Sequence, residues 1–231
     1  MFFGGIVKNS LIDYPGKISC VLFVSGCNFE CPYCHNPGLV KGKGQSDVLS
    51  EDNAVDFLES RKGFLDGVVI SGGEPTLKSD LSSFCERVKN LGYPVKLDTN
   101  GSRPQAIKEL VDRGLVDYIA MDIKTDPNRY SPFITANCNP DAILSSINII
   151  MESGFPYEFR TTCVRPVVDE EAIANISRLI KGAMLYVLQC FHSKDVLYPD
   201  FFKDRRLYYN ELDIMHLKAI AEPMVKRAFV R

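Results

Sequence analysis

The segment KISCVLFVSGCNFECPYCH, residues 17–35, is the part of the sequence from which the fold is best predicted. It begins with a nearly continuous apolar run rich in β-branched residues, Lys17–Ser25, which predicts a strand buried on both faces. The loop that follows carries Cys27, Cys31 and Cys34 in a C-x3-C-x2-C spacing. Thiolates are soft ligands, suited to an iron–sulfur cluster or to zinc. Three of them can hold three irons of a 4Fe-4S cluster and leave the fourth iron open for a small molecule.

The zinc alternative differs in its fourth ligand. A structural zinc site needs four ligands, and His35, directly after Cys34, is the available one. In that case the chain would be a zinc-stabilised binding module without catalysis. The cysteine spacing by itself leaves both kinds of site open.

Downstream of the cysteine loop, the chain alternates between short apolar runs and amphipathic segments. The runs predict strands, and the amphipathic segments with their capping residues predict helices. The result is about six β/α units with short connections, the pattern of a parallel sheet covered by helices. The later strands are predicted at 67–71, 93–98, 116–123, 157–164 and 184–190, and the helices at 47–60, 78–91, 104–113, 141–152, 169–181 and 211–221.

This alternation leaves a choice of α/β architecture. No Gly-rich phosphate loop opens the first helix, which disfavours a dinucleotide-binding fold. An open doubly wound sheet and a complete or partial β/α barrel remain. Polar residues follow successive strand ends, where the active sites of β/α barrels lie. Residues 4–15 are predicted as an approach segment, 38–46 as a mobile surface loop and 125–140 as a loop.

The composition is that of an ordinary soluble enzyme. The chain has 231 residues, of which 45% are hydrophobic and 24% charged, enough for one large domain. The formal net charge is −2 and there is no basic block, so we expect no nucleic-acid partner. No apolar run is long enough to span a bilayer, and no signal peptide is recognisable. We therefore expect a cytoplasmic protein without a membrane partner.

The chain has eight cysteines, three of them in the loop. In a chain of this length without an export signal, a reducing compartment explains them better than disulfides do. The other five do not form a second C-x-x-C cluster, which argues against an inserted ferredoxin-like cluster. They are predicted to be mostly buried thiols: Cys20, Cys85, Cys138, Cys163 and Cys190.

Motifs along most of the chain resemble those of a known family. They are SLIDYPGK (10–17), GCNFECPYCHNP (26–37), SGGEPTL (71–77), LDTNGS (97–102), AMDIK (120–124), EFRTT (158–162) and LQCFH (188–192). On these motifs the chain resembles the radical S-adenosylmethionine (SAM) superfamily. Within it, the resemblance is to the glycyl-radical enzyme activating enzymes, above all to the activating protein of anaerobic ribonucleoside-triphosphate reductase. Taken together, the motifs reduce zinc to a minor alternative.

The resemblance implies a fold and a reaction. The fold would be a partial (β/α)6 TIM-like barrel in a single radical SAM domain, residues 1–231, with a core at about 17–192 and a tail at about 193–231. The enzyme would be an oxidoreductase with a 4Fe-4S cluster on Cys27, Cys31 and Cys34, and SAM on the fourth iron. Reductive cleavage of SAM would give methionine and a 5′-deoxyadenosyl radical, with no catalytic residue beyond the cluster and SAM ligands.

The resemblance also implies partners. The radical would abstract a Cα hydrogen from one glycine of a large glycyl-radical enzyme, namely anaerobic ribonucleoside-triphosphate reductase. Reduced flavodoxin or ferredoxin would donate the electron. Residues 38–46 and the tail are candidates for the partner interface. The alternatives are an activase of another glycyl-radical enzyme and a radical SAM enzyme that acts on a small molecule, similar to deazapurine synthases.

Two groups of SAM-binding residues are implied around the cysteine loop. Gly72, Gly73 and Glu74 would accept hydrogen bonds from the SAM amino group, because glycine allows close backbone approach. The alternative is an ordinary Gly-Gly turn. Tyr33 would pack against the adenine ring, with a core aromatic as the alternative. His35 would be a neighbour of the cofactor.

A third group is charged. Asp98, Asp122 and Lys124 would surround the methionine end of SAM, where the acids can help bind a monovalent cation. The alternative is a structural ion-pair network. Arg160, inside a β-forming run, needs a carboxylate partner, either that of SAM or a nearby acid such as Glu158. His192 would lie near the SAM ribose, although a lone histidine is more often structural.

Overall fold

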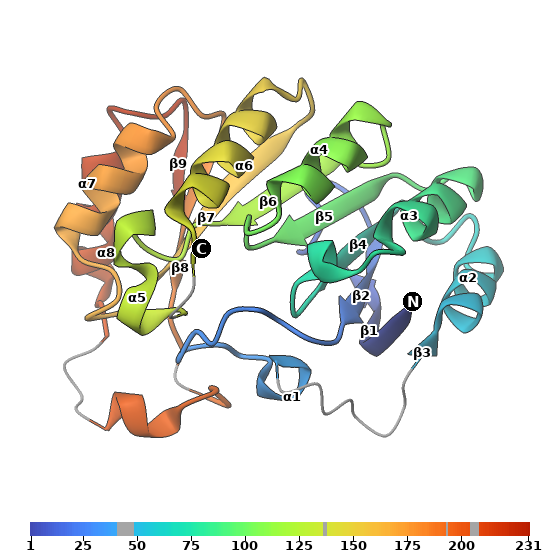
Figure 1. Cartoon of the computed structure of the whole chain (residues 1–231), viewed down its shortest axis with the longest axis horizontal. Helices are drawn as coiled ribbons and strands as arrows, with labels where there is room; N and C mark the ends of the chain where they lie inside the picture. The colour runs from blue at the N-terminus through green and yellow to red at the C-terminus, as the bar shows by residue number, and fades with distance from the viewer. Residues whose placement is uncertain (41–48, 136–137, 193, 204–207) are drawn as a thin grey trace. The chain divides into compact units, whose positions relative to one another are not determined.

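The computed structural model describes residues 1–40, 49–135, 138–192, 194–203 and 208–231, and its elements are labelled in Figure 1. The chain forms two compact units, each of which is described by itself. Unit 1 comprises residues 1–28, 38–99 and 105–119, and unit 2 comprises residues 29–37, 100–104 and 120–231. The single radical SAM domain expected from the resemblance stays a prediction.

Unit 1 is built on a sheet with the strand order β3-β1-β2-β4-β5. The predicted strands are present as β2 (Ser19–Val24), β4 (Gly67–Gly72) and β5 (Val95–Thr99). These three strands are parallel, with Cys20 opposite Val68 and Val68 opposite Val95. Their central residues are buried on both faces, as expected for a parallel sheet covered by helices.

The first ten residues correct the sequence prediction. The predicted approach segment is largely a strand, β1 (Phe2–Ser10), which runs antiparallel to β2 and also pairs with the short β3 (Leu49–Ser50). Its Phe3 ring is buried and lies 5.0 Å from the ring of Phe84. The prediction failed because a glycine-containing strand without regular alternation carries a weak periodic signal.

The helices of unit 1 follow the predicted pattern with shifted starts. Ser50 caps α2 (Glu51–Ser60) by accepting a hydrogen bond from the Asn53 N–H, so α2 starts later than predicted. A single 3-10 turn, η1 (Pro75–Leu77), precedes α3 (Leu81–Asn90), and α4 (Pro104–Asp112) lies where it was expected. The predicted loop 38–46 begins as the short α1 (Pro37–Val40), and its remainder lies outside the described residues.

Unit 2 contains the second set of β/α elements. The chain passes from unit 1 into unit 2 within β6 (Tyr118–Asp122), and the strand order from there is β6-β7-β8-β9. The strands are β7 (Tyr157–Cys163), β8 (Tyr186–Cys190) and β9 (Ala228–Val230), with β8 parallel to both neighbours. The predicted helices are present as α6 (Pro140–Glu152), α7 (Glu170–Leu179) and α8 (Glu211–Ala221).

The sequence prediction missed several short elements of unit 2. The predicted loop 125–140 contains η2 (Pro127–Arg129) and α5 (Tyr130–Phe133), and the predicted tail contains η3 (Pro199–Phe202) and β9. Each is too short to show a period in the sequence. Of the five cysteines predicted to be mostly buried, Cys138 and Cys190 are partly exposed. None of the described helices is long and apolar enough to cross a membrane.

Candidate cofactor site

The cysteine loop joins the two units. Cys27 follows β2 in unit 1, and Cys31 and Cys34 belong to unit 2. The Cys34 N–H donates to the Cys31 carbonyl oxygen over 3.0 Å, which closes a tight turn between these two cysteines. Cys31 is buried, and Cys27 and Cys34 are partly exposed. Within the described part of the chain, no three His, Cys, Asp or Glu side chains are arranged as a metal site, so the ligand assignment stays a prediction.

The chemistry of this loop nevertheless fits an iron–sulfur cluster. The predicted ligands are soft thiolates, the usual cluster ligands. In unit 2, Lys124 lies close enough to Cys31 and Cys34 for its charge to interact with both sulfurs. Burial alone would lower the pKa of Lys124, but the Asp122 carboxylate, with further contributions from Cys31 and Cys34, outweighs burial and raises the pKa. The positive charge of Lys124 would therefore stabilise Cys31 and Cys34 as negatively charged cluster ligands.

Main-chain hydrogen bonds fix the loop within unit 2. The Leu197 N–H donates to the Cys34 carbonyl oxygen over 3.0 Å, and the Tyr198 N–H donates to that of Pro32 over 3.1 Å. Just before Cys31 in the loop, the Glu30 N–H donates to the Ile134 carbonyl oxygen over 2.9 Å. Part of the predicted tail thus supports the cysteine loop directly.

Two predicted cofactor residues lie on this loop with opposite exposure. Tyr33 is buried, which raises its pKa well above the usual range, and its hydroxyl lies 3.5 Å from the Lys124 carbonyl oxygen. His35 is exposed, with Nδ1 3.2 Å from the Lys194 carbonyl oxygen. Both rings flank Phe191, at centroid distances of 6.4 Å for Tyr33 and 5.9 Å for His35. Their roles at a cofactor stay predictions.

In unit 1, the GGEP turn lies against the end of β2. The Gly73 N–H donates to the Val24 carbonyl oxygen over 2.7 Å, and the Glu74 N–H donates to that of Gly26 over 2.8 Å. A Cβ on Gly73 would lie 2.0 Å from the Gly26 carbonyl oxygen, and one on Gly72 would lie 2.3 Å from the Val24 nitrogen. Gly72 also has a φ of +119°, which glycine adopts readily. The two glycines therefore let this turn dock on the residues just before Cys27.

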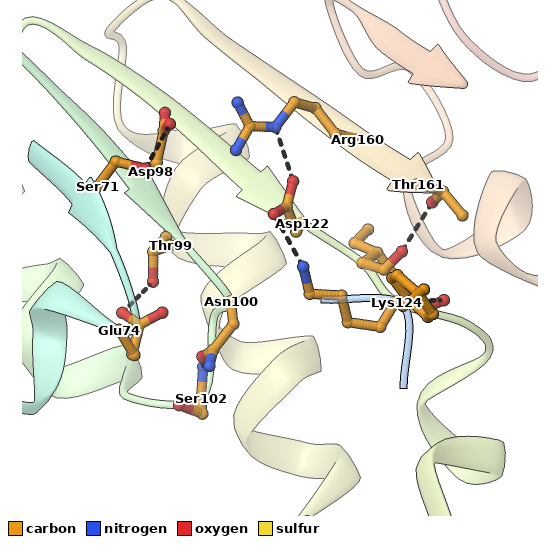
Figure 2. Close-up of polar contacts among 12 residues, drawn as sticks. Ser71, Glu74, Asp98, Thr99, Asn100, Ser102, Asp122, Lys124, Arg160 and Thr161 are labelled. Atoms are coloured by element: carbon orange, nitrogen blue, oxygen red, sulfur yellow. Dashed lines mark hydrogen bonds and ion pairs between the residues drawn. The ribbon is translucent and has the colours of Figure 1, made fainter. Parts of the chain in front are cut away.

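Glu74 braces the same turn. Its side chain is completely buried, and Oε1 accepts a hydrogen bond from the Thr99 hydroxyl over 2.8 Å (Figure 2). The same oxygen accepts from the Thr76 N–H over 3.0 Å. The Thr76 hydroxyl donates to the same oxygen. These hydrogen bonds link the end of β4 to the end of β5. The role of Glu74 in SAM binding stays a prediction.

Asp98, the other predicted site residue of unit 1, has a partner that the sequence analysis missed. Its Oδ2 accepts from the Ser71 hydroxyl over 3.0 Å (Figure 2), and its Oδ1 is paired with the Lys96 ammonium. The Lys96 side chain is only 1% exposed. Lys96 could have been recognised from the sequence as a charged residue inside a predicted strand. Arg160 was singled out for that reason.

The charged residues of unit 2 form one cluster around Asp122, shown in Figure 2. Oδ1 of Asp122 accepts from the Arg160 Nε–H over 2.7 Å, and Oδ2 accepts from the Lys124 ammonium over 2.9 Å. Burial would raise the pKa of Asp122, but the two cations outweigh it and hold that pKa well below its usual range. Arg160 thus pairs more closely with Asp122 than with Glu158, the acid named from the sequence, which lies 3.8 Å away.

The surroundings of this cluster hold one further residue that the sequence did not reveal. The Tyr130 hydroxyl accepts a hydrogen bond from the Lys124 N–H over 3.1 Å, and its ring meets that of Phe29 edge-on at 5.6 Å. Tyr130 is buried within the predicted loop 125–140, where no pattern marked it. His192, which follows β8, is exposed, and its predicted place near the SAM ribose stays a prediction.

These features define a class of protein. Each unit has parallel strands whose carboxyl ends lead into the cysteine loop, the GGEP turn or the Asp122 cluster, as in enzymes built on β/α barrels. The family model described as the radical SAM superfamily matches residues 21–180. The chain therefore belongs to the radical SAM superfamily.

Individual relatives agree with this membership. The chain is 39% identical over 235 residues to a candidate glycyl-radical enzyme activating enzyme of Methanocaldococcus jannaschii, a match that covers 98% of this chain and 94% of the relative. It is 28% identical over 184 residues to the pyruvate formate-lyase-activating enzyme of Streptococcus mutans, covering 74% of this chain and 68% of that enzyme. The crystal structure of Streptococcus suis SuiB matches with a TM-score of 0.66 at 12% identity. That match covers 91% of this chain and 48% of SuiB, so the chain spans about half the length of that protein.

Family membership confirms several predictions. The fold is the α/β, partial TIM-barrel fold of radical SAM enzymes. The chain is an enzyme of this superfamily, whose cofactors are a 4Fe-4S cluster and SAM. The zinc-binding module is thereby excluded as the overall interpretation, and the ligand and SAM-binding residues remain proposals.

Proposed function

We propose that this chain is a radical SAM activase that installs a glycyl radical in a separate partner enzyme. The similarity to a candidate activating enzyme over 98% of the chain carries this proposal, because it includes the tail as well as the barrel strands. When bound, the cluster and SAM supply a 5′-deoxyadenosyl radical after one-electron reduction, and the hydrogen it takes comes from the Cα of one glycine of the partner.

The residues of the chain would divide the work of binding and orientation. Cys27, Cys31 and Cys34 would hold the cluster, and the tight turn from Cys31 to Cys34 keeps the backbones of these two residues close. Lys124 and Arg160 would receive the carboxylate of SAM, since a guanidinium and an ammonium both pair well with carboxylates. Asp122 would hold these two cations in place, as its two hydrogen bonds in unit 2 indicate.

The proposal also names the glycyl-radical enzyme that would receive the radical. We infer anaerobic ribonucleoside-triphosphate reductase, on the basis of the seven motifs that the chain shares with its activating protein. A reduced flavodoxin or ferredoxin would supply the electron. The relative from Streptococcus mutans, named for pyruvate formate-lyase, makes a formate-lyase type of partner the second candidate.

An anaerobic radical assay tests both levels of the proposal. The protein, reconstituted with iron and sulfide, is reduced and incubated with SAM and with either purified reductase or purified pyruvate formate-lyase. Electron paramagnetic resonance then shows which partner gains a glycyl doublet, and chromatography measures 5′-deoxyadenosine. We expect a doublet with the reductase and stoichiometric 5′-deoxyadenosine.

Each other outcome has a defined meaning. A doublet only with pyruvate formate-lyase would keep the activase and replace the partner. Release of 5′-deoxyadenosine that requires a small substrate and gives no glycyl radical would overturn the activase proposal in favour of an enzyme acting on small molecules.

A further inference from the structure

The two carboxylates expected to help bind a monovalent cation are both occupied by protein cations. In unit 1, Asp98 has Lys96 on Oδ1 and the Ser71 hydroxyl on Oδ2. In unit 2, Asp122 has Arg160 on Oδ1 and Lys124 on Oδ2. All four carboxylate oxygens thus accept from a donor of the same unit. A potassium or sodium ion at either carboxylate would have to lie beside an ammonium or guanidinium that already neutralises it, so these residues fit such a site poorly as they stand.

Lys96 is the unusual member of this set. Its side chain is 1% exposed, and an ammonium at that depth is costly unless it is paired and hydrogen-bonded. Residues two apart on a strand point to the same face, so β5 delivers Lys96 and Asp98 together. The ammonium also lies 5.8 Å from the centre of the Tyr118 ring, a distance at which the ring face attracts a cation.

Lys96 is therefore built into the strand as a fixed positive charge. Asp98 is the penultimate residue of β5, and Lys96 reaches it from near the start of the strand; the next residue, Thr99, is tied to Glu74. A cation that approached Asp98 would be repelled by the ammonium already on Oδ1. The positive charge that would bridge Asp98 to the SAM carboxylate is thus already supplied by the chain.

We propose that Lys96 is a positioning residue that replaces the monovalent cation at Asp98, so that SAM binding by this chain does not depend on potassium or sodium. The proposal rests on the SAM chemistry of the superfamily and on the predicted place of Asp98 near SAM. It does not rest on the identity of the glycyl-radical partner.

Equilibrium dialysis of SAM against the anaerobically reconstituted protein tests the proposal. The medium contains potassium chloride, sodium chloride or choline chloride at equal ionic strength. For the wild type we expect the same dissociation constant in all three salts within about twofold. For Lys96→Met we expect about tenfold weaker binding in choline chloride, partly restored by potassium or sodium, which can then occupy the place of the ammonium.

A matched control separates this effect from the loss of any ion pair. Lys89 pairs with Asp117 over 2.6 Å in the same unit but is 30% exposed, so Lys89→Met should bind SAM like the wild type in every salt. The decisive measurement is whether potassium or sodium restores SAM binding by Lys96→Met. A purely structural defect would weaken SAM binding equally in potassium, sodium and choline chloride. Lys96→Arg, which keeps a positive charge, should remain independent of the salt.

Two results would overturn the proposal. The first is a wild-type affinity for SAM that rises tenfold or more when potassium or sodium replaces choline. This measurement uses only the wild type, so it is decisive even when Lys96→Met does not fold. The second is a Lys96→Met protein that is folded and either binds SAM like the wild type in choline or is weakened equally in all salts. Release of 5′-deoxyadenosine after reduction of the same wild-type samples tests the superfamily chemistry separately.

Discussion

The GGEP turn of unit 1 and the Asp122 cluster of unit 2 both follow the carboxyl end of a strand, but they are held by different forces. The turn depends on the absence of side chains, since Gly73 lies against the Gly26 carbonyl oxygen and Glu74 is buried among hydroxyl and N–H donors. The cluster depends on charge, with two cations on one carboxylate. In one protein, a strand-end motif is thus required for packing in one place and for electrostatics in another.

The cysteine loop, with Cys27 in unit 1 and Cys31 and Cys34 in unit 2, should show the largest effect. Cys27→Ala, Cys31→Ala and Cys34→Ala are each expected to abolish SAM cleavage, because a cluster with two protein ligands would not be retained. Circular dichroism should show that the folds of both units persist. The measurements are iron content, visible absorption and 5′-deoxyadenosine release.

Cys138→Ala is the matched control, since Cys138 is partly exposed and belongs to no cysteine cluster in the sequence. It should keep its iron and its activity. Retained SAM cleavage in any of the three loop variants would refute the ligand assignment for that residue.

Packing at the GGEP turn is tested by Gly73→Ala. The new Cβ would lie 2.0 Å from the Gly26 carbonyl oxygen, so the turn must move away from β2. We expect the free energy of unfolding to fall by about 3 kcal/mol, at the upper end of overpacking effects. Urea denaturation measures it.

Gly5→Ala is the control for this substitution. Its Cβ would meet only a side-chain carbon of Phe23 at 3.8 Å, an ordinary contact, and its cost should be within about 0.5 kcal/mol. Equal costs at the two positions would mean that the turn is not held by close approach, which would remove the contrast with the Asp122 cluster.

The charge at the Asp122 cluster is tested by Asp122→Asn across pH. Arg160 and Lys124 depress the pKa of Asp122, so the carboxylate stabilises the fold above its unfolded pKa, and the stabilisation is lost as pH falls through the lower folded value. We expect the variant to be less stable by on the order of 2 kcal/mol at neutral pH. The difference should shrink below about pH 4.

An exposed pair gives the comparison for this experiment. Asp112 pairs with Lys108 across one helical turn, with 56% of its side chain exposed, and such pairs contribute little. Asp112→Asn should therefore follow the wild type at all pH values. If Asp122→Asn stays below the wild type by a constant amount on acidification, the carboxylate charge is not what stabilises the cluster.

The same contrast explains how far the sequence could predict the site. The parallel strands and main helices were predictable, because buried β-branched runs and amphipathic segments have distinct periods. The GGEP turn was recognised as a glycine turn, but its docking on Gly26 depends on a close approach that no local pattern records. Tyr130 was missed because its importance arises from the Lys124 N–H, a partner that only the folded chain supplies. Lys96 could have been noticed as a charged residue within a strand, but its pairing with Asp98 is visible only in the folded chain.

The smallest effect is expected from Tyr33→Phe, which asks whether hydroxyl groups add to the ionic cluster. The Tyr33 hydroxyl lies 3.5 Å from the Lys124 carbonyl oxygen, at the limit of a hydrogen bond, so its removal should cost at most about 0.5 kcal/mol. Tyr130→Phe removes the acceptor of the Lys124 N–H at 3.1 Å and should cost about 1.5 kcal/mol, because a buried donor loses its partner. Urea denaturation of both variants measures the difference. If Tyr33→Phe loses as much stability as Tyr130→Phe, then the hydroxyl groups of both tyrosines hold the Lys124 backbone. The cluster of unit 2 would then depend on neutral hydrogen bonds, like the GGEP turn of unit 1, as well as on its charges.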